Sequence, residues 1–169
     1  IKDMAKALLI SRQDAIRFTN MNGNIDTDKF IQYVSIAQDI HIQSMLGTRL
    51  LEKIQAEIIA GTLANPYKDL LEIYIKPSLI HAAMLEFLPF SAVTIANKGV
   101  YKHGAENSET VSKEEIDFLV EKQRQTFMHY KERCVSYICD NNTDFPEYNT
   151  NTGSDMSPNE STNFTGWIL

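Results

Sequence analysis

The longest amphipathic pattern in this chain covers residues 112–139 and sets the dimensions of any fold that the chain can adopt. Ser112 with Glu115 three residues later is the signature of a capping box, which marks the start of a helix. From there, apolar side chains recur with the period of a helix for about 28 residues, or about 42 Å at the helical rise. The sequence therefore predicts one long C-terminal helix that acts as the spine of the domain. Its apolar face holds Ile116, Leu119, Val120, Phe127, Tyr130, Cys134, Tyr137 and Ile138.

Two shorter segments with the same period lie upstream, at residues 28–46 and 48–60. Both are amphipathic, so each is predicted to be a helix that buries one face. Glycine is favoured just beyond the C-terminus of a helix, and Gly47 and Gly61 are therefore expected to end the two helices.

A third helical segment is expected to begin with Asn65 as its N-cap and Pro66 as its first helical residue. Pro77 is expected to interrupt or kink it. Residues 78–88 then carry apolar side chains almost all round, which is typical of a helix buried at the centre of a bundle. Pro89 is expected to end this buried helix.

Residues 93–102 alternate in character around Asn97, Lys98 and Gly99, which predicts a short β-hairpin or extended loop. Together these patterns predict a mainly α fold. It is a helical bundle with one long C-terminal spine helix, the short hairpin or loop, and an extended C-terminal arm. We expect two regions, a helical domain at residues 1–139 and the arm at residues 140–169.

The predicted arm is rich in Asn, Thr and Ser, contains five acidic residues, and has no Lys or Arg. Such a segment cannot bury enough apolar surface by itself to offset the entropy of ordering its backbone. We therefore expect it to lie across a neighbouring subunit, with its few apolar side chains as anchors. The alternative is that it packs back on its own domain. The expected interface residues are Phe145, Pro146, Tyr148, Phe164, Trp167 and Leu169.

Charge argues against nucleic-acid binding, cysteine spacing against a disulfide or metal pair, and hydropathy against a membrane-spanning helix. The formal net charge is −6, of which the arm supplies −5, and no basic cluster of the kind that binds nucleic acid is present. Cys134 and Cys139 lie five residues apart on a predicted helix and so face different directions, which argues against a disulfide or a metal pair. No apolar run approaches the ~20 residues that span a bilayer.

The residues that could carry catalysis are scattered. None of the four histidines has a second ligand at the spacing of a known metal motif. His41 and His81 fall within apolar faces and are expected to be core histidines with hydrogen-bond partners. Residues 20–30 superficially resemble a calcium loop, but Phe18 and Lys29 occupy positions where carboxylates are required. We expect no catalytic, cofactor-binding or metal-binding residues, and hence no enzymatic activity.

Several local sequences, in the order in which they occur, resemble the head-tail connector (neck ring or adaptor) family of tailed phages that infect Bacteroidetes, the crAss-like phages included. The likeness covers nearly the whole chain after about Leu9. Its most specific pieces are QDIHIQSMLGTRL at residues 38–50, IKPSLI at residues 75–80 with LPF at residues 88–90, and FPEYN at residues 145–149. The closing FTGWIL at residues 164–169 also belongs to the resemblance.

This resemblance implies a structural virion protein, made in the cytoplasm of the bacterial host and located in the neck between capsid and tail. It implies a subunit of a ring of about twelve copies that is stacked below the portal protein and contacts adjacent neck or tail proteins. Genome DNA would pass through the ring without specific binding, and a neutral or acidic inner surface would prevent adhesion. The family offers no catalytic residues to transfer.

Two functions from other classes remain open on the residues alone. One is a small helical protein-binding module or regulator of a cellular partner, and the other is an enzyme whose site does not show in the sequence. A large ring in solution would support the connector, whereas a stable monomer with a defined small ligand would favour the others.

Overall fold

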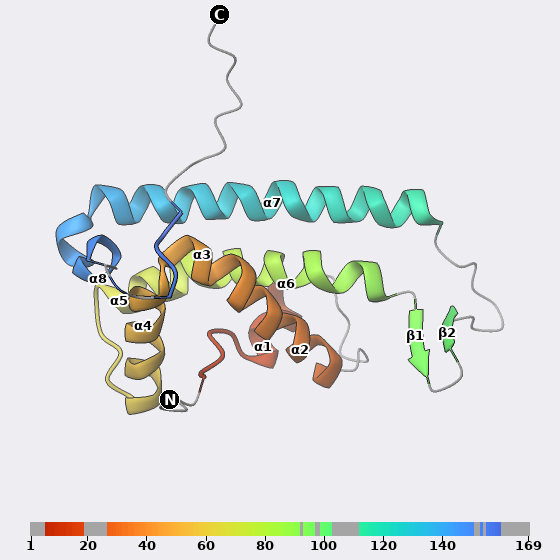
Figure 1. The fold of residues 1–169 in the computed structure, drawn as a ribbon, viewed down its shortest axis with the longest axis horizontal. Coiled ribbons are helices and arrows are strands. Elements are labelled where there is room, and N and C mark those ends of the chain that lie inside the picture. The colour runs from red at the N-terminus through yellow and green to blue at the C-terminus, as the bar shows by residue number, and fades with distance from the viewer. Residues whose placement is uncertain are drawn as a thin grey trace, which may run out of the picture.

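The structure is a computed structural model and describes residues 6–18, 27–91, 93–96, 99–102, 112–150, 153 and 155–159. It is mainly α, as the sequence predicts. The long helix α7 (Lys113–Asp140) runs along one side of the molecule, antiparallel to α6 (Lys76–Ser91), and the N-terminal helices pack mainly on the opposite side of α6 (Figure 1). The Ser112 hydroxyl accepts from the Glu115 N–H while the Glu115 carboxylate accepts from the Ser112 N–H, so the predicted capping box is confirmed.

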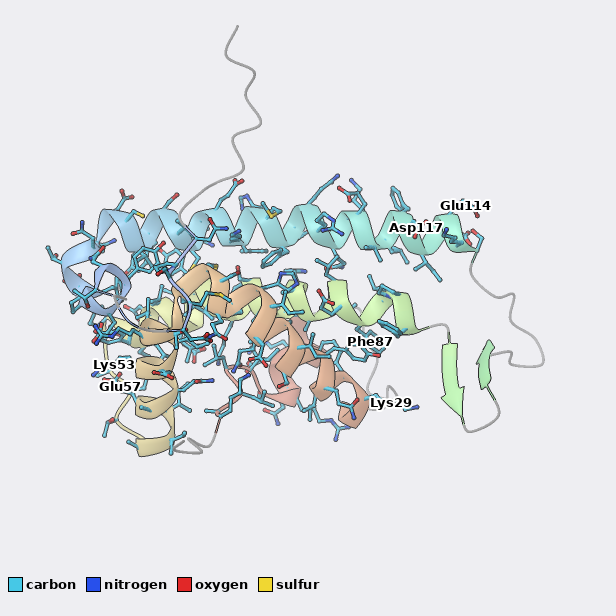
Figure 2. All side chains as sticks on the ribbon, viewed as in Figure 1. Lys29, Lys53, Glu57, Phe87, Glu114 and Asp117 are labelled. Atoms are coloured by element: carbon cyan, nitrogen blue, oxygen red, sulfur yellow. The ribbon has the colours of Figure 1, made fainter. Side chains whose placement is uncertain are left out.

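Helix α6 lies at the centre of the bundle, as expected for a helix without a polar face. It packs against α7 on one side and against α2 (Thr27–Ala37) and α1 (Arg12–Phe18) on the other. Near its C-terminus, α6 packs against aromatic rings. The Phe87 ring (labelled in Figure 2) meets the Phe30 ring edge-on at a centroid distance of 5.6 Å and the Tyr33 ring at 5.4 Å. The buried side chains of this helix are Ser78, Leu79, Ile80, Ala82, Ala83, Met84 and Leu85.

Two expectations about prolines need correction. Pro89 does not end α6, which continues for two residues to Ser91, because a proline φ angle is helical and only one backbone hydrogen bond is lost in the last turn. Pro66 precedes the next helix instead of starting it, and the Asn65 side chain donates to the Asp69 carboxylate at 2.9 Å instead of capping the backbone.

The predicted helix at residues 28–46 is continuous but contains a π-helical stretch. Its parts are α2 (Thr27–Ala37), η1 (Gln38–Ile42) and α3 (Gln43–Leu46). Gly47, at φ 75°, ends it and α4 (Thr48–Ala60) follows, ended in turn by Gly61 at φ 68°. Both glycine predictions are confirmed, and the left-handed φ angles explain why glycine is needed.

A second π-helical stretch explains how Pro77 is accommodated. The segment η2 (Leu70–Ile75) follows α5 (Tyr67–Asp69) and leads into α6 without a break. There the Lys76 N–H bonds to the Leu71 carbonyl, five residues back. The wider π-type turn lies directly before the proline, where the missing N–H and the ring would disturb an α-helical turn.

The predicted hairpin is confirmed in its backbone. Strand β1 (Val93–Ala96) pairs antiparallel with β2 (Gly99–Lys102), and Ala96 faces Gly99. The hairpin lies at the end of the molecule where α6 ends and α7 begins (Figure 1). The turn residues between the strands fall outside the described residues.

The chain between Asp140 and Thr150 is part of the helical domain, which corrects the predicted domain boundary. A 3-10 turn, η3 (Asn142–Asp144), and a short helix, α8 (Pro146–Asn149), fold back against α4. Phe145 between them is 0% exposed and meets Tyr67 and Tyr137 at centroid distances of 5.6 and 6.0 Å. The polar composition of the arm gave no sign that this turn is buried. Two large aromatic side chains are enough to bury it.

A short strap at residues 6–11 precedes α1 (Arg12–Phe18) and is held by a buried glutamine. Gln38 is 0% exposed, its amide N–H donates to the Ala7 carbonyl at 3.1 Å, and its amide oxygen accepts from the Leu9 N–H at 3.1 Å. The Gln55 amide donates to the same Ala7 carbonyl at 3.0 Å. The strap therefore pairs with side-chain amides as it would with the edge of a strand.

Replacing Gln38 by leucine is expected to lower the free energy of unfolding by about 1–3 kcal/mol, because the buried Leu9 N–H would lose its acceptor. Hydrogen exchange at the Leu9 amide should accelerate more than exchange in α7. Glu52→Leu, on the exposed face of α4, is the control for added apolar surface. Unchanged protection at Leu9 would show that the amide contacts do not hold the strap.

Candidate functional site: a groove and the C-terminal segment

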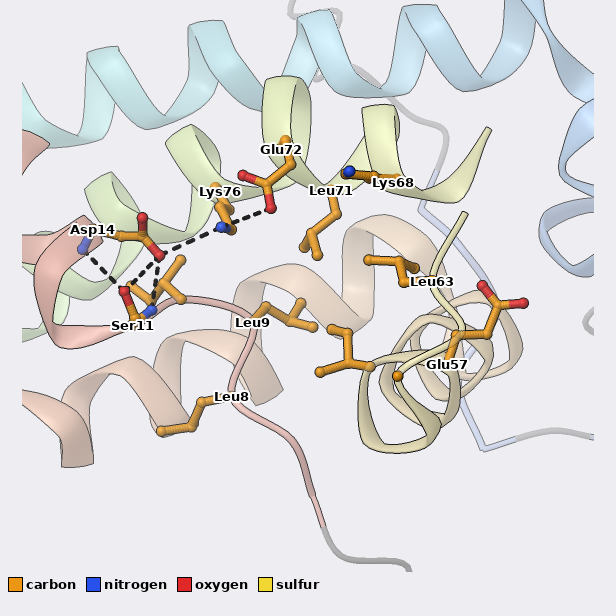
Figure 3. A pocket seen from close by; sticks show the side chains of 13 residues that line it. Leu8, Leu9, Ser11, Asp14, Glu57, Leu63, Lys68, Leu71, Glu72 and Lys76 are labelled. Carbon is orange, nitrogen blue, oxygen red and sulfur yellow. Dashed lines mark hydrogen bonds and ion pairs between the residues drawn. The ribbon is translucent and has the colours of Figure 1, made fainter. Parts of the chain in front are cut away.

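An open groove of about 710 Å³ lies between the strap, the end of α4 and η2 (Figure 3). Its apolar part is formed by residues from three separate segments of the chain. Leu8, at 36% exposure, remains open to solvent, whereas Leu9 and Leu71 are buried beneath the groove. The volume falls in the ~300–1,000 Å³ range of binding pockets. The apolar lining residues are Leu8, Leu9, Ile10, Ile58, Leu63 and Leu71.

One wall of the groove carries an ordered ionic network. The Asp14 carboxylate accepts from the Ser11 N–H and hydroxyl, each at 2.9 Å, and lies 3.4 Å from the Lys76 ammonium. Lys76 also pairs with Glu72 at 2.8 Å. Partial burial opposes the charge on both groups, yet the Ser11 hydrogen bonds and Lys76 lower the pKa of Asp14, and the two carboxylates raise the pKa of Lys76.

This network predicts a pH dependence. Because the folded state lowers the pKa of Asp14, the interaction stabilises the fold at neutral pH, and this stabilisation is lost as the pH falls through the lowered pKa. Asp14→Asn should therefore be less stable than the wild type at pH 7, and the difference should shrink below about pH 4. Urea denaturation at a series of pH values measures it. An equal difference at pH 7 and at pH 3 would contradict the assignment.

The opposite wall belongs to α4. Glu57 lies next to Lys53 there, with Lys53 Nζ 2.9 Å from Glu57 Oε1 (Figure 2). The second carboxylate oxygen of Glu57, Oε2, is buried without a hydrogen-bond partner among the described residues. Lys53 also lies over the Tyr67 ring, 5.5 Å from its centroid. Burial and a 2.7 Å hydrogen bond donated to Glu147 raise the pKa of the Tyr67 hydroxyl. The wall is therefore tied to α8.

The described C-terminal segment, residues 155–159, crosses the break between α3 and α4. The Thr48 N–H donates to the Met156 carbonyl at 2.9 Å, and the Asn159 N–H donates to the Ser44 carbonyl at 2.8 Å. The Met156 N–H also donates to the Thr48 hydroxyl at 2.9 Å. Helix ends leave such backbone groups unpaired. The segment therefore satisfies polar groups that the break at Gly47 exposes, and up to Asn159 it packs on its own domain.

The predicted interface residues divide into three groups. Phe145 and Tyr148 are 0% and 2% exposed inside their own chain, so the prediction that they anchor a neighbouring subunit is wrong. Pro146 lies at the exposed start of α8. Phe164, Trp167 and Leu169 lie outside the described residues, and the prediction for them stands untested.

The predicted hydrogen-bond partners of His41 and His81 are present, but both side chains are half-buried at the edge of the core and not within it. His41 Nε2 lies 2.7 Å from Glu86 Oε1, and the ring meets Phe127 at a centroid distance of 4.9 Å. His81 Nδ1 lies 2.8 Å from Gln123 Oε1, and the His81 ring stacks on Tyr130. These imidazoles link α6 to η1 and α7.

The described part of the chain holds no group of three or more His, Cys, Asp or Glu side chains that could bind a metal ion. Cys134 is buried and Cys139 is exposed, and the two are not joined in a disulfide. Burial raises the pKa of the Cys134 thiol to about 12, so this cysteine stays protonated at neutral pH. Within the same residues, no helix is long and apolar enough to cross a membrane.

The groove was not predicted from the sequence, although a signal was present. The apolar run Leu8–Leu9–Ile10 comes directly before Ser11, which with Asp14 forms a helix-start pattern. The hydroxyl–carboxylate contact is present in the structure. An apolar run in front of a capped helix indicates a strap that packs on the core.

Comparison with known proteins places most of the chain in a family. Residues 42–157 match the model of a family of unknown function (DUF6712). No curated protein and no solved structure matches the chain. The matched range extends from the last residue of η1 to the C-terminal segment at the α3–α4 break, and it covers more than half of the chain. The chain therefore belongs to the DUF6712 family.

Proposed function

We propose that this protein is a structural virion protein, a head-to-tail connector subunit that forms a ring of about twelve copies below the portal in a phage neck. It lines part of the channel through which the genome passes, contacts the portal and adjacent neck or tail proteins, and performs no catalysis. The proposal rests first on the resemblance of its local sequences to the connector family of Bacteroidetes phages.

One structural observation carries the proposal further. The C-terminal segment is fastened to the outside of its own domain at Ser44 and Thr48, so residues 160–169 start from a fixed point at the surface. This stretch contains Phe164, Trp167, Ile168 and Leu169. Aromatic anchors of this kind often dominate protein interfaces. A surface-tethered apolar segment suits a subunit that joins its neighbours, as a ring requires.

The distribution of exposed apolar side chains also supports assembly. Phe118 and Leu119, near the start of α7, are 62% and 46% exposed. The expectation that Leu119 lies on the buried face of this helix is wrong, because the buried residues of α7 begin only at Phe127. Adjacent exposed apolar residues mark candidate contact surfaces. Lys122 lies over the Phe118 ring at 5.9 Å, so the surface combines apolar and charged groups as interface rims do.

The net charge of −6 supports a channel wall that does not bind DNA. A lining with many Lys and Arg contacts to phosphate would hold the genome in place. We expect no measurable binding of duplex DNA at physiological salt. Binding with a steep salt dependence would contradict this part of the proposal.

Light scattering of the purified full-length chain, combined with negative-stain images, tests the ring. The expected result is a closed ring with about twelve times the mass of one chain, formed alone or on addition of the portal protein. A monomer under both conditions would contradict the proposal. The groove is the observation that supports the second candidate function, a small helical protein-binding module. A monomer that binds a defined ligand in the groove would support that function instead of the connector.

A further inference from the structure

The groove and the C-terminal segment lie at opposite ends of α4. Met156 is bonded to Thr48 at the start of α4, whereas Glu57, Ile58 and Gly61 line the groove at its end. In Figure 1 the segment crosses α3 on the side where α7 lies, and the strap lies on the other side. A protruding segment and a receiving groove on different faces form a heterologous pair, which generates a ring when the rotation closes.

We propose that the groove of each copy receives residues 160–169 of the adjacent copy, with Phe164 and Trp167 against its apolar floor. This inference rests on the proposed ring and adds the surface that receives the arm. It assigns the groove residues Leu8, Ile58 and Leu63 to the interface between subunits.

The chemistry of the two surfaces matches. Four of the ten residues, Phe164, Trp167, Ile168 and Leu169, are large and apolar, and the groove exposes Leu8 and the half-buried Ile58 and Leu63. Burial of such side chains is favourable by about 25 cal/mol per Å² of apolar surface. The groove volume of about 710 Å³ admits several side chains at once.

The charges at the rim of the groove match those at the start of the segment 160–169. Glu160 is the only charged residue among the ten and comes first. Lys68 lines the groove and is exposed, and no ion pair of its ammonium is found among the described residues. The other lysine of the groove, Lys76, is already paired with Asp14 and Glu72. Lys68 can therefore pair with Glu160 where the segment enters.

Chain length disfavours the groove of the same copy for the first anchor. Phe164 lies five residues beyond Asn159 and can extend at most about 18 Å from it. Helix α4 has 13 residues and is about 20 Å long, and Asn159 is fastened beyond its first residue, at Ser44. Phe164 could therefore approach the groove at the far end of α4 in its own copy only if the intervening backbone were fully extended along the whole helix. A groove in a neighbouring copy has no such limit.

The competing acceptor is a strip on the surface of α2 and η1. Ile36 and Ile40 are 42% and 54% exposed, and Ile40 lies one helical turn from Ser44. The segment could reach this strip within its own copy. Two isoleucines on a convex helix surface bury less of an indole ring than a groove does, which is why the groove is the preferred acceptor.

Cross-linking of the full-length chain separates these acceptors. Leu63→Cys and Phe164→Cys are combined in one chain that also carries Cys139→Ser, and the protein is treated with a short bis-maleimide. The expected result is a ladder of covalent multimers up to the closed ring. Each single-cysteine variant should give no ladder. A second chain, with Ile40→Cys and Phe164→Cys, tests the strip.

The outcomes distinguish the groove contact from the strip on α2 and η1, and they test the ring separately. A ladder from the Leu63 pair supports the inference, whereas cross-linking only within one chain, or only through Ile40, overturns it. Light scattering of the same proteins before cross-linking tests the ring separately. Rings without a Leu63 cross-link would overturn this inference alone, and monomers throughout would overturn the ring as well.

A binding measurement gives the size of the effect. Trp167→Ala and Leu63→Glu should each raise the dissociation constant of the ring about 30-fold or more. Thr62→Glu adds the same charge to the adjacent exposed position and is the matched control. Unchanged helical circular dichroism shows that the variants fold. Folded variants that assemble as the wild type does would contradict the proposed contact.

Discussion

Replacing Phe145 by alanine is expected to lower the free energy of unfolding by about 3–5 kcal/mol, because a fully buried aromatic ring would leave a cavity. Phe145 is 0% exposed and lies among the rings of Tyr67 and Tyr137. It closes the turn between α7 and α8, so its loss should also detach α8 from α4. Urea denaturation followed by circular dichroism measures the change.

Phe18→Ala is the matched control, since it removes the same side chain from a position that is 58% exposed. Surface substitutions of this kind usually change stability by less than about 0.5 kcal/mol. Protein concentration must be held constant, because assembly adds to apparent stability. Equal effects at the two positions would contradict the packing of α8. For the same reason, a chain cut after Asn142 should fail to fold stably.

Leu79→Asp is expected to prevent folding. Leu79 is 0% exposed on α6, at the centre of the bundle, and the structure offers no cation beside it among the described core residues. An unpaired carboxylate in such a place costs several kcal/mol. Domains are stable by only about 5–15 kcal/mol in total, so the helical circular dichroism signal should be largely lost.

Ile73→Asp is the control that introduces the same carboxylate at an exposed position. Ile73 is 46% exposed on η2, where a carboxylate stays in contact with water. Its variant should keep the helical signal and lose little stability. Leu85→Asp, at 6% exposure, should resemble Leu79→Asp. Retention of native helicity by Leu79→Asp would show that α6 is not the centre of the fold.

Helix positions were predictable where one local interaction decides them. The capping box at Ser112 needs only residues three apart, and the glycines at 47 and 61 act through their own φ angles. The burial of residues 78–88 follows from composition alone, because no side of that helix is polar. These signals do not depend on the rest of the chain.

The C-terminal boundary was not predictable in the same way. Phe145 and Tyr148 stand in a polar segment, and the buried ring of Phe145 packs against Tyr67, which is distant in sequence. The fastening of residues 155–159 depends on backbone groups freed at Gly47, about a hundred positions away. The groove likewise brings together Leu8, Ile58 and Leu71 from three segments. Periodicity reports on local faces and cannot show such contacts.

The masses of the particles formed by the full-length chain and by a chain that ends at Asn159 test the proposed ring most directly. Sedimentation of both proteins at equal concentration provides the comparison. The full-length chain is expected to form a ring with about twelve times the mass of one chain. The shortened chain keeps Phe145, Tyr148 and the contact at Ser44, so it should remain helical but monomeric. A full-length chain that stays monomeric both alone and with the portal protein, or a shortened chain that assembles equally well, would contradict a ring joined by its C-terminal residues.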